Sequence, residues 1–291
     1  MLANILMSRA LGPVRRSFPR SWRTWVVDRL HAEPYERLIN ANGSLRSTAR
    51  LSNLGKVSAA TNFMHREKSD AAMAATTSWY GGDYFEFGSV GLNTFRSFLS
   101  AFHIAGLDTR FPDTHFYAFD VFGNLTSPDE ATASEMKSFD QRTGYFSDQF
   151  SGDEIAHHRR LIEQHKLFVD QCHLVQGFFA DTLTAQRVAQ LQSEGRQIGF
   201  AFIDCNFEEF YKQVFEFIFD LMAPNSYIYM DEYFQSSGAA HLFDDFADRL
   251  RERRDIECMY VRSAGAFGGM FRLRPVRTLE PLRVAGSVES P

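Results

Sequence analysis

Acidic side chains recur in this sequence within or directly after short apolar runs. The five residues are Glu86, Asp120, Asp204, Asp231 and Glu232. In a mainly parallel sheet the carboxyl ends of the strands lie along one edge, and the ligand crevice lies outside that edge. The sequence therefore predicts that these carboxylates gather around one crevice, where they could accept hydrogen bonds from ribose hydroxyls or bind a hard cation.

The stretch 84–95 predicts a strand, a tight turn and an amphipathic helix. Its apolar run contains one acidic residue, Glu86, and breaks at Gly88 and Gly91 before apolar residues recur at helical spacing. Glycines let a backbone approach a ligand closely, and a helix start presents free N–H groups to a carboxylate or phosphate. An ordinary strand-to-helix turn would look the same, so this pattern alone leaves both interpretations open.

The remaining carboxylates suggest two kinds of chemistry. Asp120, downstream of the glycine turn, suits a carboxylate that accepts hydrogen bonds from both hydroxyls of a ribose, with a turn or helix-capping role as the alternative. The other three offer hard oxygen ligands for Mg²⁺, which could orient vicinal hydroxyls and lower the pKa of one of them. Because Asp204 and Asp231 directly end apolar runs, we interpret them as ligands rather than as surface residues.

Strand-like and helix-like segments alternate regularly after this turn. The pattern predicts a doubly wound, mainly parallel α/β sheet with right-handed crossovers. The last two strands are joined by a glycine-rich loop and are predicted to pair antiparallel. The predicted strands span 84–87, 115–120, 173–176, 198–204, 226–231, 256–261 and 269–273.

The chain divides by composition into three parts. We expect a basic arm and helical cap or lid over 1–79, a ligand-binding domain over 80–275 and a tail over 276–291. Residues 1–27 contain five arginines and no acidic residue, and we interpret them as a basic surface arm rather than a targeting segment. A long polar insertion at about 125–150 is a candidate lid.

Composition argues against several classes of function. A content of 44% hydrophobic and 23% charged residues is that of a soluble globular protein, and no apolar run is long enough to predict a transmembrane helix. The net charge of −5 argues against a nucleic-acid partner. Three cysteines without paired spacing fit a reducing compartment, so we expect a cytoplasmic protein. The aromatic-rich amino-terminal region could mediate homo-oligomerisation.

Histidines and a cysteine offer further candidate groups. His157, His158 and His165 could suggest a metal cluster, but their helical stretch is polar and basic, which favours a solvated face. Cys205, beside Asp204, is predicted to be a small buried core residue.

The motif EFGSVGLNT resembles the first motif of class I S-adenosylmethionine-dependent methyltransferases, in which an acidic residue precedes the glycine turn by two positions. The chain is similar, over about 80–275, to the macrocin O-methyltransferase group, which methylates sugar hydroxyls of macrolides and aminocoumarins. The blocks that carry this similarity are AFDVFGNL, GYFSDQFSGDEI, LVQGFFADTL, IGFAFIDCNFEEF and MDEYFQSSGAAHLFDDF. The resemblance implies a Rossmann-like, seven-stranded methyltransferase sheet with an antiparallel last strand. It also implies Mg²⁺-assisted methylation of a sugar or other small-molecule hydroxyl.

The resemblance also implies a role for each matching position. The implied contacts to S-adenosylmethionine are Glu86, Gly88, Ser89 and Gly91 for the methionine part, Asp120 for the ribose, and Gly177 with Phe178 for the adenine. The implied Mg²⁺ ligands are Asp204, Asp231 and Glu232. Asp204 is also our candidate for the base that takes the proton from the acceptor hydroxyl.

The sequence departs from the family pattern at several positions, and the tyrosine that usually follows the fourth-strand motif is absent. Glu232 replaces the second aspartate of the usual pair, Asn206 replaces the second aspartate of the fourth-strand motif, and Ala240 stands where a basic residue is usual. An NAD-dependent oxidoreductase on a similar sheet is one alternative, although the turn lacks the third glycine of that fingerprint. A non-catalytic binding protein that kept the fold is the other.

Overall fold

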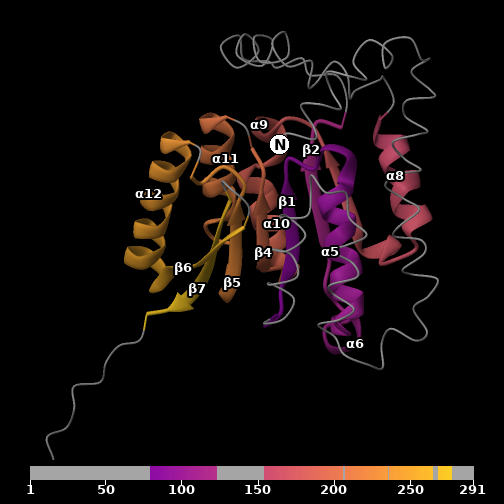
Figure 1. Ribbon diagram of the computed structural model, residues 1–291, viewed down its shortest axis with the longest axis horizontal. Helices are drawn as coiled ribbons and strands as arrows, with labels where there is room; N and C mark the ends of the chain where they lie inside the picture. The colour runs from indigo at the N-terminus through magenta and orange to yellow at the C-terminus, as the bar shows by residue number, and fades with distance from the viewer. Residues whose placement is uncertain (1–78, 123–153, 206, 235, 265–267, 277–291) are drawn as a thin grey trace, which may run out of the picture.

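The computed structural model describes residues 79–122, 154–205, 207–234, 236–264 and 268–276. The predicted amino-terminal cap, the insertion at 125–150 and the tail lie almost entirely outside these ranges. Within them, seven strands form a sheet in the order β3-β2-β1-β4-β5-β7-β6 (Figure 1). The strands are β1 (Asp83–Phe87), β2 (Phe116–Asp120), β3 (Cys172–Gln176), β4 (Ile198–Ile203), β5 (Met222–Met230), β6 (Ile256–Ala264) and β7 (Gly268–Pro275).

Strands β1 to β5 pair in parallel, and β7 lies antiparallel between β5 and β6. The predicted mainly parallel sheet with an antiparallel ending is therefore confirmed. Strand β1 is hydrogen-bonded on both sides, to β2 and to β4. Every residue of β1, β2 and β4 is buried, as expected for strands whose two faces are both covered.

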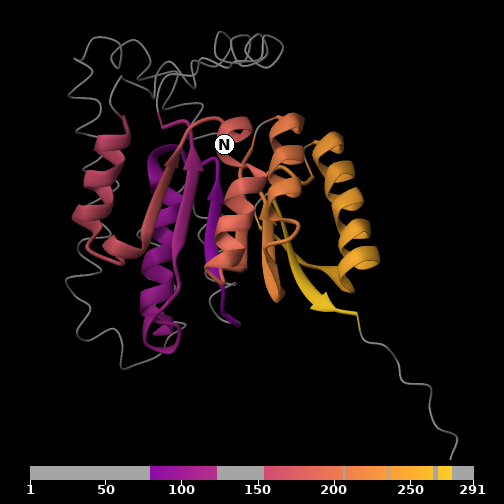
Figure 2. The same ribbon diagram turned by 180° about the vertical axis from the view of Figure 1, so that it is seen from behind.

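Helices cover both faces of the sheet. Helices α5 and α8 pack on one face, and α9 to α12 pack on the other, as the two opposite views show (Figures 1 and 2). The helices are α5 (Asn93–Ile104), α6 (Leu107–Arg110), α8 (Glu154–His165), α9 (Phe179–Thr182), α10 (Ala185–Ser193), α11 (Glu208–Ile218) and α12 (Ser237–Arg254). Two short 3₁₀ helices, η2 (Val90–Leu92) and η3 (Val169–Gln171), complete the described elements.

Aromatic side chains build the core on both faces of the sheet. On the α5 face, Tyr84 stacks on Phe98 with ring centroids 3.9 Å apart. On the opposite face, Phe85 stacks on Tyr117 at 4.5 Å. Alternate residues of β1 thus enter different layers, as the two-residue repeat of a strand requires. This packing explains why a chain of 291 residues uses 29 phenylalanines.

Helix α8 corrects one sequence prediction. The helix ends at His165, and Lys166 and Phe168 then take left-handed backbone angles. The predicted solvated face for its histidines is wrong, because His158 and His165 are buried. His165 Nε2 lies 3.3 Å from Ser100 Oγ of α5. Burial, with the Arg96 charge as a smaller cause, holds the pKa of His165 well below its usual value.

The described residues also bear on the predictions about membrane-spanning helices and about the cysteines. Among the described residues, no helix is long and apolar enough to cross a bilayer. All three cysteines are free thiols, and Cys205 is buried in the core as predicted.

Strand β6 forms one outer edge of the sheet. It exposes Met259, Tyr260 and Val261 by 37%, 51% and 46%. Its pairing with β7 shifts register between Tyr260 and Arg262, which marks a β-bulge at Val261. The strand therefore does not present an even row of hydrogen-bonding groups along its length.

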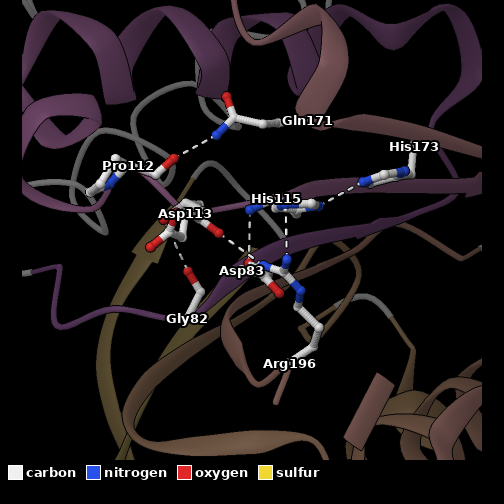
Figure 3. Close-up of polar contacts among 9 residues, drawn as sticks. Gly82, Asp83, Pro112, Asp113, His115, Gln171, His173 and Arg196 are labelled. Atoms are coloured by element: carbon white, nitrogen blue, oxygen red, sulfur yellow. Dashed lines mark hydrogen bonds and ion pairs between the residues drawn. The ribbon is translucent and has the colours of Figure 1, made fainter. Parts of the chain in front are cut away.

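A polar cluster joins the amino ends of β1, β2 and β3, opposite the edge where the parallel strands end (Figure 3). Asp83 Oδ1 accepts a 2.8 Å hydrogen bond from the backbone N–H of His115 and lies 3.5 Å from Arg196 Nη1. Arg196 Nη2 lies 2.9 Å from His115 Nε2, and His115 Nδ1 lies 2.8 Å from His173 Nε2. Because the guanidinium only donates, His115 accepts at Nε2 and donates from Nδ1 to His173. Both imidazoles must stay neutral to keep this chain of hydrogen bonds.

Titration of this cluster has opposing effects on stability. Burial, followed by the Arg196 charge, lowers the pKa of His115, and the same two causes lower the pKa of His173, while Glu194 acts oppositely on both. Burial raises the pKa of Asp83 from 3.8 to about 6, although the His115 N–H and Arg196 oppose it. The histidines therefore destabilise the fold as the pH falls below their unfolded pKa. Asp83 destabilises it as the pH rises through the window from 3.8 to about 6.

The substitution Asp83→Asn measures how much the ionised carboxylate of Asp83 destabilises the fold. Asparagine keeps an acceptor for the His115 N–H but stays neutral, so the variant should gain stability over the wild type at about pH 7.5, on the order of 1–3 kcal/mol. The gain should vanish below about pH 3, where Asp83 is protonated in both the folded and the unfolded state. Urea unfolding across this range measures the difference, with the exposed Asp113→Asn as the control. A difference that does not change with pH would contradict the assignment.

Candidate active site at the carboxyl edge of the sheet

The strand register places Glu86 deepest among the predicted carboxylates. Glu86 lies between Ala118 of β2 and Phe202 of β4, and it is 2% exposed. Asp120 and Asp204 stand two residues further along the neighbouring chains than the partners of Glu86, at the carboxyl edge of the sheet. The backbone N–H of Asp204 bonds to Phe87 O at 2.9 Å, which places Asp204 beside the end of β1.

Asp231 continues the same row on β5. Its N–H bonds to Ile203 O at 3.0 Å, one strand beyond the Asp204 contact. Its Oδ1 accepts a 2.8 Å hydrogen bond from the Tyr229 hydroxyl. Glu232 follows directly, and both carboxylate residues are half-buried.

Gly88 occupies the position in this row where β1 would carry a side chain. Its φ is +86°, and a Cβ atom there would lie 2.1 Å from the carbonyl oxygen of Asp204. Gly91, with φ of +74°, turns the chain within η2 before α5 begins. The close approach of β1 to β4 therefore requires glycine at 88, and it leaves no side chain between Asp120 and Asp204.

The Asp120 carboxylate links the end of β2 to this glycine turn through hydrogen bonds. Its Oδ1 accepts a 3.1 Å hydrogen bond from the Phe122 N–H, and the N–H groups of Val121 and Ser89 also stabilise its charged form. Burial outweighs them and raises the pKa of Asp120 from 3.8 to about 6. Ser89 Oγ lies 3.4 Å from Glu86 O, so Ser89 bonds to β1 as well as to β2.

Gly177 and Phe178 lie at the same edge, after β3. The Gly177 N–H bonds to Asp120 O at 3.0 Å. Gly177 has φ of +140°, and a Cβ atom there would lie 2.9 Å from the Thr182 side chain. Thr182 Oγ1 in turn donates a 2.9 Å hydrogen bond to Phe178 O, which fixes this turn against α9.

The parallel register brings the acidic residues of separate strands to the same edge of the sheet, as the topology predicted. Their charges act on neighbouring groups. Burial first, and then the charges of Glu86 and Asp204, raise the pKa of Tyr84 well above its usual value. Burial, followed by Asp204, Asp120 and Glu232, raises the pKa of the Cys205 thiol.

Tyr211 of α11 lies within the electrostatic influence of the same carboxylates. Burial raises the pKa of its hydroxyl, and Cys205, Glu232, Asp204 and Asp231 raise it further. The hydroxyl is buried and has no hydrogen-bond partner in the described part of the chain. In the same part, no group of three histidine, cysteine or acidic residues is arranged to hold a metal ion.

Sequence reasoning did not find the three tyrosines that contact or face these carboxylates. Tyr84 and Tyr229 each stand two residues before a carboxylate on the same strand. That spacing was a usable signal, because residues two apart share a face of a strand. Tyr211 gave no such signal, since its position depends on how α11 packs against the sheet.

The strand order, with β7 antiparallel between β5 and β6, is that of class I S-adenosylmethionine-dependent methyltransferases. Residues 50–263 match the family described as Macrocin-O-methyltransferase (TylF), and the chain belongs to this family. It is therefore a methyltransferase, in line with the resemblance and against the oxidoreductase alternative.

Solved structures of low sequence identity share the fold. The O-methyltransferase NovP matches with a TM-score of 0.52 and 15% identity, over 71% of this chain and 79% of NovP. CalS11, a calicheamicin methyltransferase, matches with a TM-score of 0.51 and 16% identity, over 82% of this chain and 91% of CalS11. A search of curated proteins gives no significant match.

The contact between Gly88 and Asp204 predicts an asymmetry between two glycines. Gly195 also has a positive φ, of +70°, but nothing lies within 4 Å of a Cβ atom there. Gly195→Ala should therefore cost only backbone strain, about 1 kcal/mol, whereas Gly88→Ala should cost at least ~2 kcal/mol more because β1 and β4 must separate. Urea unfolding of both variants measures this, and equal losses would contradict the close contact.

Proposed function

We propose that the chain transfers the methyl group of S-adenosylmethionine to a hydroxyl of a sugar or another small-molecule natural product. The observation that carries this proposal is the meeting of carboxylates from β1, β2, β4 and β5 at one edge of a methyltransferase sheet. Family membership supports the reaction type. The two similar structures are an O-methyltransferase and a calicheamicin methyltransferase, which supports a hydroxyl of a natural product as the acceptor.

We assign the cofactor contacts to residues at the ends of β1, β2 and β3, as the family resemblance implies. Glu86 sits deepest and can pair with the ammonium group of the methionine part, while Gly88, Ser89 and Gly91 form the adjoining turn. Asp120 stands beside this turn and suits the ribose hydroxyls. Gly177 and Phe178, bonded to the end of β2, suit the adenine.

The candidate ligands for Mg²⁺ beside the cofactor are Asp204, Asp231 and Glu232, although the described residues do not hold three such groups in a metal-binding arrangement. Hard oxygen ligands fit this ion, which commonly keeps several waters and uses one or two protein carboxylates. The unpartnered Tyr211 hydroxyl within their field supports the fit, because a bound water would give it an acceptor. When bound, Mg²⁺ would lower the pKa of the acceptor hydroxyl.

The residues of the chain have separate tasks in the reaction. The sulfonium of S-adenosylmethionine, when bound, supplies an electrophilic methyl group. Asp204, half-buried at the end of β4, takes the proton from the acceptor hydroxyl as the oxygen attacks the methyl carbon. Glu86 would hold the methionine part of the cofactor and Asp120 its ribose, so that the methyl group faces the acceptor. This orientation lowers the entropic cost of bringing the two reactants together.

The departures from the family pattern bear on the acceptor side. Glu232 keeps a carboxylate at the second position of the pair, with a longer side chain. Asn206 lies outside the described residues. The candidate base is Asp204, the carboxylate that directly follows β4.

Cofactor binding should depend on the ionisation of Asp120. Because the ribose hydroxyls donate to a carboxylate, S-adenosylhomocysteine should bind more weakly as the pH falls below about 6, by up to about tenfold per unit. Calorimetric titration from about pH 7.5 to pH 5 measures this dependence. Asp120→Asn should bind weakly at every pH with a flatter profile. Tight binding of NAD, or a flat profile in the wild type, would contradict the assignment.

Methyl transfer should depend on Asp204 and on divalent cations. Asp204→Asn should lower the rate at least about 100-fold, because it removes the base and a metal ligand together. Radiolabelled S-adenosylmethionine and a panel of sugar-bearing acceptors provide the assay, with EDTA followed by Mg²⁺ testing the metal. The exposed Asp220→Asn is the control. Wild-type activity in Asp204→Asn would refute the assignment of the base.

A further inference from the structure

Two tyrosines hold carboxylates of the site in the same way. The Tyr84 hydroxyl donates to Glu86 Oε2 at 2.5 Å on β1, and the Tyr229 hydroxyl donates to Asp231 Oδ1 at 2.8 Å on β5. In both cases the donor stands two residues before the acceptor on one strand. The donor therefore lies beneath the carboxylate, on the α5 face of the sheet.

The Tyr84 ring is fixed by its neighbours. It is fully buried, and it stacks on Phe98 with centroids 3.9 Å apart and planes within 9°. Phe200 of β4 contacts the ring from the sheet at 5.5 Å. A ring held on two sides gives its hydroxyl a fixed position.

The hydroxyl can act only as a donor in this position. Burial, and then the charges of Glu86 and Asp204, keep the pKa of Tyr84 well above its usual value, so the proton stays on the tyrosine. A hydrogen bond from a neutral hydroxyl to a carboxylate is short and strong, and the 2.5 Å distance fits this type.

We propose that Tyr84 is a positioning residue for the cofactor, which fixes the carboxylate of Glu86 two residues before the glycine turn at Gly88 so that it can receive the cofactor's ammonium group. This inference rests on the proposed function, since it requires Glu86 to bind the methionine part. A glutamate side chain has three rotatable bonds, and a fixed donor below it removes part of the entropy that ligand binding would otherwise cost.

Tyr84→Phe tests this role, because phenylalanine keeps the ring packing and removes only the donor. Isothermal titration with S-adenosylhomocysteine at about pH 7.5 should show about tenfold weaker binding, which corresponds to ~1.4 kcal/mol. The matched control is Tyr227→Phe. Phe200 is the strand partner of both Tyr84 and Tyr227, and Tyr227 is 5% exposed. Within the described part of the chain, Tyr227 makes no hydrogen bond to a carboxylate. Its variant should bind within about twofold of the wild type.

A double-mutant cycle separates positioning from a general structural effect. In a Glu86→Gln background the charged acceptor is gone, so adding Tyr84→Phe should change the affinity by no more than about twofold. A merely structural role would weaken binding equally in both backgrounds. If Tyr84→Phe does not fold, Glu86→Asp serves instead, because it keeps the charge but draws the carboxylate away from the hydroxyl. It too should bind about tenfold more weakly.

The outcomes distinguish this proposal from the one on which it rests. A wild-type protein that does not bind S-adenosylhomocysteine would overturn the proposed function. Binding by the wild type together with unchanged affinity in Tyr84→Phe, or an equal loss in the Glu86→Gln background, would overturn only the role of Tyr84.

Discussion

The central constraint in this structure is the pairing of β1 with parallel neighbours on both sides. Because β2, β1 and β4 run in the same direction and in fixed register, their last residues must emerge together along one edge. Gly88 then lets β1 pass so close to β4 that the Asp204 carbonyl occupies the place of a side chain. The site is therefore a result of backbone geometry before any of its side chains is considered.

A layer of aromatic rings below the carboxylates makes their surroundings apolar. Tyr84 and Phe200 form part of an apolar floor on the α5 face, and Glu86 lies directly above it. Burial in such surroundings disfavours isolated charge, so each carboxylate needs donors close by. For Asp120 these are backbone N–H groups, and for Glu86 and Asp231 they include tyrosine hydroxyls. The sheet thus supplies both the burial and the hydrogen bonds that offset it.

Much of the fold followed from the sequence, because period-two and helical patterns are local. The strand that ends in Asp120, for example, is as predicted. Features that depend on tertiary packing did not follow. His158 has a polar helical neighbourhood in sequence but is buried, with its ring centroid 5.1 Å from that of Phe122, and the His115–His173 contact joins residues far apart in the chain. The gathering of the acidic groups could be predicted from topology, whereas their tyrosine donors required coordinates.

The bulge in β6 has a consequence for self-association. An outer strand with a regular row of free amide and carbonyl groups is a template on which a second sheet can grow into an aggregate. The extra residue at Val261 twists this edge and interrupts that row, even though apolar side chains are exposed beside it. The bulge at Val261 therefore disfavours the pairing of this apolar edge strand with a strand of another molecule.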